Sequence, residues 1–437
     1  MRKFHISTFG CQMNEHDSEI MAGLLLEAGY EMAKSRSEAD IVIFNTCSIR
    51  ENADKRFFGT LGQLKKTKMA RKDDFTVCVC GCMPQQKHIT DTIKAKYPWV
   101  DIVFGTHNIE RLPALLANWE KDHSSQIEVL EDREAISEKL PACRLYRHKS
   151  YVNITYGCDN FCTYCIVPYT RGREKSRSAQ AIIGERKDLV ADGVKEVMLL
   201  GQNVNSYSSP SGENFADLIR EINDIDGLER IRFMTSHPKD LSDDLIKCFL
   251  ECDKLCKYLH LPVQAGSNGI LKRMNRKYTR EHYLQLVKKL REAVPDITLS
   301  TDIIVGFPGE SDEDFKETLD LVNEVGYDSA FTFLYSIRKG TPAEKYKDQI
   351  PEDVKHERFD RLVEAVNSSA EKKNAAYVGR VVDVMVDGFS KNNHKALSGR
   401  TDGFKLVNFE GDSSLIGQIV KVKIIASNTF SLEGELV

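Results

Sequence analysis

The chain has 437 residues, which at roughly 150 residues per domain predicts about three domains and excludes a single small module. Apolar residues make up 41% and charged residues 29%, a composition typical of folded globular proteins rather than disordered or fibrous ones. The net charge of −4 argues against a surface that is basic throughout, although it leaves room for local basic patches.

Twelve cysteines are the unusual feature of the composition. The first residues lack the pattern of a secretory signal, and no apolar run approaches the roughly 20 residues that span a bilayer. We therefore expect a cytoplasmic protein that does not contact membranes. In that compartment cysteines are more often metal ligands, catalytic groups or buried apolar residues than disulfides.

The first part of the chain alternates short β-rich runs with amphipathic stretches over residues 3–118. This alternation predicts an N-terminal open parallel α/β domain over 1–119. Residues 120–143 are expected to form an acidic connector, with a net charge of −4 between Glu120 and Lys139. The charged residues of that stretch are Glu120, Lys121, Asp122, Glu128, Glu131, Asp132, Arg133, Glu134, Glu138 and Lys139.

Six further strand candidates alternate with helical patterns from Ser150 to about Ala330. Polar, chemistry-bearing residues follow nearly every strand, which favours a partial (β/α)6 barrel over an open sheet. We place this α/β core at 144–374. Period-two runs broken by Gly, Asn and Asp then predict a small antiparallel β-barrel at 375–437.

The strongest motif is a CxxxCxxC run formed by Cys158, Cys162 and Cys165, directly after the first strand of the central domain. Three thiolates on one loop can bind three corners of a [4Fe–4S] cluster and leave the fourth iron open to a small molecule. Zinc ribbons use paired CxxC units, and no second pair follows. We therefore expect a cluster with one open iron.

A second group consists of Cys11, Cys47 and Cys82, each placed after one of the first three predicted strands. Because the carboxyl ends of parallel strands meet at one edge of a sheet, these three thiols are expected to converge and bind another cluster. Cys78 and Cys80 compete with Cys82 as the third ligand. Their alternation places them within the strand, as buried side chains.

The remaining cysteines are expected to have no role in chemistry. Cys248, Cys252 and Cys256 are spaced by four, which predicts one helical face that packs into the core rather than a loop around a cluster. Cys143 has no partner in the sequence and is read as incidental.

The segment YGCDNFCTYCIVPYTRGRE resembles the signature of radical SAM enzymes. With TFGCQMN, NTCSIRENA and HLPVQAGS, the resemblance extends over essentially the whole chain to the methylthiotransferase family of radical SAM enzymes. That family combines an N-terminal cluster domain, a radical SAM barrel and a C-terminal TRAM domain. Gln12, Met13 and Asn14 after the first cysteine resemble the branch that modifies isopentenylated tRNA, whereas a Pro-Lys sequence or a Lys is expected in related branches.

The resemblance implies two [4Fe–4S] clusters and S-adenosylmethionine (SAM) as both radical source and methyl donor. Cys158, Cys162 and Cys165 would hold the SAM-cleaving cluster and Tyr164 would pack on adenine, while the other three cysteines would hold an auxiliary cluster that delivers sulfur. The implied reaction converts N6-isopentenyladenosine, on the 3′ side of the anticodon, to its 2-methylthio derivative at adenine C2. The implied partners are a tRNA anticodon stem-loop, a flavodoxin- or ferredoxin-type reductant and iron–sulfur assembly proteins.

Polar residues that follow the barrel strands are candidate SAM contacts, because ligands of such barrels bind at the carboxyl ends of the strands. Each could equally satisfy backbone groups of its own loop. The candidates are Gln202, Asn203, Ser236, His237, Gln264 and Asp302.

Two short stretches each carry a net charge of +3 and are candidate RNA contacts, the alternative being ordinary solvated side chains. Their basic residues are Arg171, Arg173, Lys175 and Arg177 in the first, and Lys391, Lys395, Arg400 and Lys405 in the second.

Two other functions compete with a tRNA methylthiotransferase. The first is a methylthiotransferase that acts on a ribosomal protein, which the residues after Cys11 disfavour. The second is a non-enzymatic iron–sulfur protein that binds RNA, which does not account for a barrel with open three-thiolate clusters.

Overall fold

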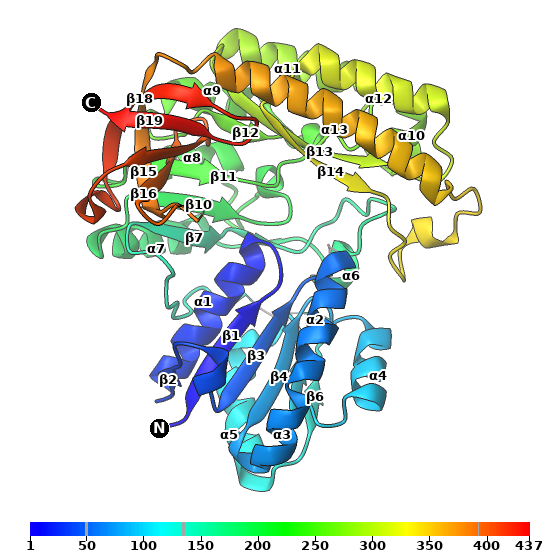
Figure 1. Ribbon diagram of the computed structural model, residues 1–437, viewed down its shortest axis with the longest axis vertical. Coiled ribbons are helices and arrows are strands. Elements are labelled where there is room, and N and C mark those ends of the chain that lie inside the picture. Colours follow the sequence, from blue (N-terminus) through cyan, green and yellow to red (C-terminus); the bar gives the residue numbers. More distant parts are fainter. Residues whose placement is uncertain (49–50, 133–135, 392) are drawn as a thin grey trace.

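The computed structural model describes residues 1–48, 51–132, 136–391 and 393–437. It shows an N-terminal parallel sheet, a central arc of parallel strands and a C-terminal barrel, in blue, green to yellow, and red in Figure 1. The predicted fold class is therefore confirmed. No helix among the described residues is long and apolar enough to cross a membrane.

The N-terminal sheet has six strands in the order β2-β1-β3-β4-β5-β6, all paired in parallel. Its central strands β3 and β4 are buried along their whole length, because helices cover both faces of the sheet. Helices α1 and α5 pack on one face, and α2 and α4 on the other. The strands are β1 Lys3–Thr8, β2 Glu31–Met32, β3 Ile41–Thr46, β4 Thr76–Gly81, β5 Ile102–Phe104 and β6 Gln126–Glu128; the helices are α1 Gln12–Glu27, α2 Glu51–Gln63, α3 Lys65–Arg71, α4 Lys87–Lys96 and α5 Leu112–Asp122.

The two edge strands of this sheet, β2 and β6, are only two and three residues long, which is too short for a period-two pattern to predict them from the sequence. Strand β6 lies within the stretch expected to be an acidic connector, and α5 also extends into it. Further along the same stretch, Glu138 pairs with Arg177 and Asp132 with Lys175 of the central part. Arg133 and Glu134 lie outside the described residues.

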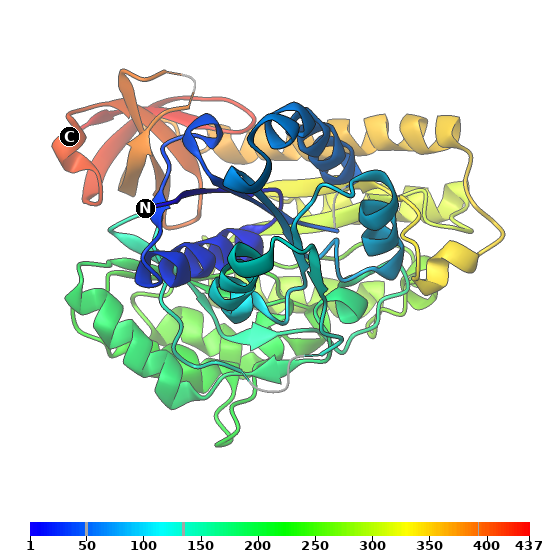
Figure 2. The same ribbon diagram turned by 90° about the horizontal axis from the view of Figure 1, so that it is seen from below.

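The central arc contains the six predicted strands, arranged as β7-β10-β11 and β12-β13-β14 and joined by a parallel bridge between Ile231 and Leu255. Helices cover its outer side, and α1 of the N-terminal part runs alongside β7 (Figures 1 and 2). The strands are β7 Lys149–Asn153, β10 Glu196–Leu200, β11 Arg230–Phe233, β12 Tyr258–His260, β13 Thr298–Val305 and β14 Ser329–Leu334; the small pair is β8 Thr155–Tyr156 and β9 Lys175–Ser176. The helices are α6 Val167–Thr170, α7 Ala179–Ala191, α8 Phe215–Asn223, α9 Asp243–Glu251, α10 Asn268–Arg273, α11 Arg280–Ala293, α12 Asp312–Val325 and α13 Glu352–Ala375.

The three cysteines at spacing four are buried, as predicted, with 0–4% of their surface exposed. The predicted helix is too long, however, because α9 ends at Glu251 and Cys252 is its extended C-cap. The chain turns there so that the Cys256 backbone N–H can donate to the Ile231 carbonyl and lead into β12. Cys252 and Cys256 therefore lie on the connection between α9 and β12, and Cys248 and Cys252 pack into the apolar core of the arc.

The C-terminal part is a closed barrel in the order β15-β16-β17-β19-β18. Its pairs are antiparallel except β17 with β19, which is parallel. An odd number of strands in a closed ring requires at least one parallel pair, so the prediction of an antiparallel barrel is wrong at this position. The strands are β15 Val381–Phe389, β16 Ala396–Thr401, β17 Leu406–Glu410, β18 Ile419–Ser427 and β19 Leu432–Leu436.

The turn between β16 and β17 packs against the amino-terminal end of the central arc. Arg232 of β11 donates hydrogen bonds to the carbonyls of Thr401 at 2.7 Å and Asp402 at 2.8 Å. Phe404 stacks on Tyr258 of β12, with ring centroids 4.9 Å apart. The C-terminal barrel thereby covers the end of the arc opposite the predicted ligand site.

Candidate active site

Cys158, Cys162 and Cys165 lie on the loop between β8 and α6, as the sequence predicts. Phe161 adopts a left-handed conformation within this loop (φ 47°), and the Cys165 backbone N–H donates to the Cys162 carbonyl at 2.9 Å. Burial, followed by the charge of Cys162, raises the pKa of Cys165 to about 12, and burial also raises that of Cys158. The hydrogen bond between the Cys165 and Cys162 backbones shows that the loop turns back on itself between these two residues.

Two nitrogen donors contact this group of thiols. Arg276 Nη1 lies 3.4 Å from Cys162 Sγ, and Asn160 Nδ2 lies 3.4 Å from Cys158 Sγ. Arg276 is buried, and it is held by the Tyr278 hydroxyl and the Pro262 carbonyl. Donors and positive charge beside the sulfurs suit thiolates that bind iron, so this loop fits a cluster.

The ends of β10 and β11 carry buried polar atoms that have no hydrogen-bond partner within the described part of the chain. They are Gln202 Oε1, Asn203 Oδ1, Ser236 Oγ and His237 Nε2. Burying such atoms without a partner is unfavourable, so their placement at the carboxyl ends of neighbouring strands indicates a site for a polar ligand.

Backbone strain marks the same end of the arc. Thr235 (φ 64°) and Gln264 (φ 70°) are left-handed residues that follow β11 and β12, and strain of this kind concentrates at functional sites. Burial lowers the pKa of His237 to about 2, with Arg276 contributing, so its imidazole is neutral. Gln264 is among the SAM contacts predicted from the sequence, whereas Thr235 is not, and no sequence pattern indicates the left-handed backbone of either residue.

The other predicted SAM contacts lie around this end of the arc. Tyr164 is half-buried against the barrel core, and burial followed by the charge of Cys162 raises its pKa. The Gln264 side chain is buried beside β13. Asp302 Oδ1 lies 3.4 Å from His260 Nε2, so this carboxylate already has a protein partner.

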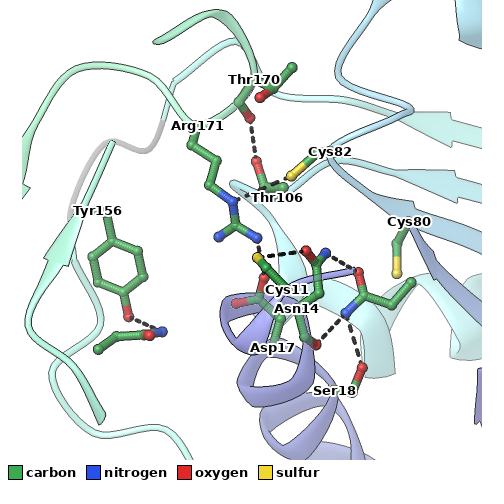
Figure 3. A network of polar contacts seen from close by, with 12 residues as sticks. Cys11, Asn14, Asp17, Ser18, Cys80, Cys82, Thr106, Tyr156, Thr170 and Arg171 are labelled. Carbon is green, nitrogen blue, oxygen red and sulfur yellow. Dashed lines mark hydrogen bonds and ion pairs between the residues drawn. The ribbon is translucent and has the colours of Figure 1, made fainter. Parts of the chain in front are cut away.

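Cys11, Cys47 and Cys82 follow β1, β3 and β4 at one edge of the N-terminal sheet, in the predicted positions. A hydrogen bond with Cys47 lowers the pKa of Cys11 to about 6, whereas burial raises that of Cys82. Asn14 accepts a hydrogen bond from the Cys11 thiol at 3.4 Å and donates to Asn45 at 3.0 Å, so it ties α1 to β3 (Figure 3).

Cys78 and Cys80 do not compete for this site. Both are completely buried within β4, with their side chains in the core between the sheet, α1 and α5. Burial raises the pKa of both thiols well above its usual range. Among the described residues no three Cys, His, Asp or Glu side chains converge as ligands of a single metal ion, whereas each thiolate of a cluster binds a different iron.

Arg171 reaches from the segment after the Cys158–Cys165 loop to the N-terminal cysteine group, a role that no motif in the sequence indicates. It follows α6, a short helix after the Cys158–Cys165 loop, and points into the N-terminal part (Figure 3). Its Nε lies 3.4 Å from Cys82 Sγ, and its Nη2 lies 2.8 Å from Asp17 Oδ2. Beside it, the Thr106 hydroxyl donates to the Thr170 carbonyl at 2.8 Å.

The interpretation of residues 171–177 as an RNA-binding surface is therefore wrong for Arg171 and Arg177. Arg171 is buried, and Arg177 is buried against Glu138 and Glu185. The side chain of Arg173 is 65% exposed and pairs with Asp159. A run of like charges in the sequence cannot distinguish surface residues from residues that pair with acids elsewhere in the chain.

The second basic stretch also contains both buried and exposed residues. Lys405 is buried and pairs with Asp328 at 3.0 Å, and Arg400 is half-buried over the Phe404 ring. Lys391 and Lys395 are exposed on the C-terminal barrel. Of the four basic residues in this stretch, Lys391 and Lys395 therefore remain candidate RNA contacts.

A cavity of about 600 Å³ lies where the three parts of the chain meet. Its wall includes Gln12 of α1, Lys149 of β7, Met198 of β10 and Lys391 of the C-terminal barrel. Met198 also packs in one apolar cluster with Cys11, so the inner wall of the cavity adjoins the N-terminal cysteine group.

Family models match three consecutive parts of the chain. Residues 3–105 match the Uncharacterized protein family UPF0004, residues 152–322 the Radical SAM superfamily, and residues 375–437 the TRAM domain. The arc of six parallel strands with a CxxxCxxC loop at its ligand end defines a radical SAM enzyme, with SAM and iron–sulfur clusters as cofactors.

Full-length relatives narrow this class. The chain is 55% identical to the tRNA-2-methylthio-N(6)-dimethylallyladenosine synthase of Clostridium botulinum over 99% of this chain and 96% of the relative. Those of Alkaliphilus oremlandii (100% and 93% covered) and Clostridium perfringens (99% and 97%) are also 55% identical. The chain belongs to this family, the MiaB-type methylthiotransferases.

Solved structures agree with the fold. The radical SAM methyltransferase TsrM from Kitasatospora setae, with cobalamin and a [4Fe-4S] cluster bound, aligns with a TM-score of 0.56 at 16% identity, over 78% of this chain and 77% of TsrM. The cobalamin-dependent enzyme OxsB aligns with a TM-score of 0.55 at 14% identity, over 84% and 56%. At these identities the likeness shows a shared architecture alone.

Proposed function

We propose that this protein is a tRNA methylthiotransferase that converts N6-isopentenyladenosine beside the anticodon to 2-methylthio-N6-isopentenyladenosine. The observation that carries the proposal is the pair of cysteine groups, one from each α/β part, with Arg171 reaching from the segment after the first group to Cys82 of the second. The family to which the chain belongs agrees with it. No observation favours a ribosomal protein as substrate or a non-enzymatic role.

Cys158, Cys162 and Cys165 are proposed to hold one [4Fe–4S] cluster, and Cys11, Cys47 and Cys82 the second. When bound, the first cluster and SAM supply the radical that removes hydrogen from adenine C2, and the second cluster supplies the sulfur that is methylated. The protein's own contribution is to hold the two sites in adjoining parts of the chain and to keep water away. Met13, Met198 and Leu200 are buried side chains available for the latter role.

The polar residues at the barrel end are proposed to bind SAM. The unpartnered atoms of Gln202, Asn203 and Ser236 are available to hydrogen-bond its ribose, amino and carboxylate groups. Tyr164, Gln264 and Asp302 complete the proposed set. The neutral imidazole of His237 adds no second positive charge next to the sulfonium.

The anticodon stem-loop is proposed to dock over the cavity between the three parts. Lys391 can neutralise a phosphate there. The side chains of Phe389 and Phe430 are at least half exposed, so an unstacked base can stack on either ring. We further propose that the enzyme works in the cytoplasm, is reduced by a flavodoxin- or ferredoxin-type protein and receives its clusters from assembly proteins.

The proposal is tested with reconstituted full-length protein, SAM, a reductant and isopentenylated tRNA. A variant with alanine at Cys158, Cys162 and Cys165 is expected to form neither 5′-deoxyadenosine nor the methylthio nucleoside. Alanine at Cys11, Cys47 and Cys82 is expected to abolish the nucleoside product but retain SAM cleavage. The matched control is Cys252→Ala, a buried cysteine outside both groups, which should retain both activities.

Either of two results would exclude this function. The first is SAM cleavage by the protein that lacks Cys158, Cys162 and Cys165. The second is an unchanged level of 2-methylthio-N6-isopentenyladenosine in tRNA from a strain in which the gene has been deleted, measured by mass spectrometry of nucleosides.

A further inference from the structure

Arg171 is a buried arginine whose contacts belong to a different part of the chain from its own backbone. Its guanidinium lies between Cys82 Sγ at 3.4 Å and Asp17 Oδ2 at 2.8 Å, and its side chain is 7% exposed (Figure 3). The residue lies six positions after Cys165. One short segment therefore carries ligands for one proposed cluster and a charged donor for the other.

Contact with a cysteine sulfur distinguishes Arg171 and Arg276 from the buried Arg177. Arg276 makes the same contact inside the arc, with Nη1 3.4 Å from Cys162 Sγ. Arg177, only six positions from Arg171, hydrogen-bonds carboxylate and carbonyl oxygens of Glu138, Glu185 and Asn153. Each cysteine group thus has one guanidinium at one of its thiols.

A donor and a positive charge at a cluster thiolate have a defined electrostatic effect. The reduced cluster carries one more negative charge than the oxidised cluster, so a nearby cation stabilises the reduced form and raises the reduction potential. Burial strengthens the effect because the local dielectric constant is low. Asp17, with a side chain 4% exposed, offsets part of the charge of Arg171.

We propose that Arg171 is a positioning residue that sets the reduction potential of the cluster at Cys11, Cys47 and Cys82 from across the domain boundary. It also makes the binding of that cluster depend on contact between the N-terminal part and the radical SAM part. The inference rests on the auxiliary cluster of the proposed function and extends it by naming what controls that cluster.

The test uses the full chain with Cys158, Cys162 and Cys165 replaced by alanine, so that one cluster remains. A redox titration followed by electron paramagnetic resonance measures its potential. Arg171→Gln removes the charge and is expected to shift the potential to a more negative value. Asp17→Asn removes the opposing charge and should shift it to a more positive value, whereas the control Arg177→Gln should leave it unchanged.

The possible results distinguish failure of this inference from failure of the proposed function. A parent protein that binds no iron would overturn the auxiliary cluster and this inference with it. Two results would overturn the inference but not the auxiliary cluster, provided that the parent protein binds about four irons per chain. One is a reduction potential in Arg171→Gln equal to that of the parent. The other is a shift to a more negative potential in Asp17→Asn. Loss of the cluster from a folded Arg171→Gln protein, with retention in Arg177→Gln, supports the dependence on contact. If Arg171→Gln does not fold, the direction of the shift in Asp17→Asn decides.

Discussion

Arg232 offers a quantitative test of how the C-terminal barrel is attached to the radical SAM part. Its side chain is fully buried, pairs with Glu196 at 2.9 Å and donates hydrogen bonds to the carbonyls of Thr401 and Asp402. The substitution Arg232→Met keeps a long side chain of similar reach but removes the charge and all three contacts. It leaves the Glu196 carboxylate buried without its cation.

The expected loss follows from these contacts. Removing one partner of a buried ion pair costs about 3–5 kcal/mol, so Arg232→Met is expected to lower the free energy of unfolding by about 4 kcal/mol. Replacing Glu196 by Met as well removes the unpaired charge. The double variant should therefore lose about 2 kcal/mol, mainly from the two carbonyls left without a donor.

The assay is urea unfolding followed by circular dichroism and by tryptophan fluorescence. Both tryptophans, Trp99 and Trp119, are buried in the N-terminal part, so fluorescence reports that part specifically. The circular dichroism transition should shift more than the fluorescence transition. A loss below about 1 kcal/mol in Arg232→Met, or a double variant no more stable than the single, would refute the reasoning.

Three further predictions concern the cysteine loop, the SAM site and the RNA surface. Gly157→Ala should reduce cluster binding, measured as iron and sulfide content, because Gly157 is left-handed (φ 73°) and a Cβ there would lie 2.1 Å from a backbone oxygen. Gly193→Ala, at φ 88° with open space around it, should cost about 1 kcal/mol of stability but leave the iron content unchanged. His237 stays neutral in the folded protein (pKa about 2) whereas the unfolded chain takes up a proton below pH 6.5, so stability falls as pH falls. Between pH 6.5 and pH 5, the free energy of unfolding of the His237→Asn apoprotein, measured with urea, should therefore fall by about 1.5 kcal/mol less than that of the wild-type apoprotein. Replacing Lys391 and Lys395 by Gln should weaken tRNA binding and reduce its salt dependence by about one unit per phosphate contact, while SAM cleavage is retained.

The controls for these predictions use exposed positions. His282→Asn, on the surface of α11, should not change the pH dependence, and equal slopes for wild type and His237→Asn would contradict the assignment. Iron loss equal in Gly157→Ala and Gly193→Ala would show that the clash is not responsible. An unchanged salt dependence in the double lysine variant would remove that surface from the RNA site.

The sequence alone determined the architecture and the two cysteine groups. The six strands of the arc show clear apolar runs with turn residues between them, and local periodicity needs no tertiary information. Cys11, Cys47 and Cys82 could be grouped because the carboxyl ends of parallel strands meet at one edge. The strand alternation correctly set Cys78 and Cys80 in the core.

Tertiary structure alone decided what the charged and polar residues do. Arg171 and Arg177 belong to a basic run, yet each is buried against acids more than seven residues away in the sequence, and no local pattern encodes such pairing. The unpartnered atoms at the ends of β10 and β11 emerge only when every neighbouring donor and acceptor is placed. Periodicity is a property of a segment, whereas burial and pairing of a charge depend on what the rest of the chain brings next to it.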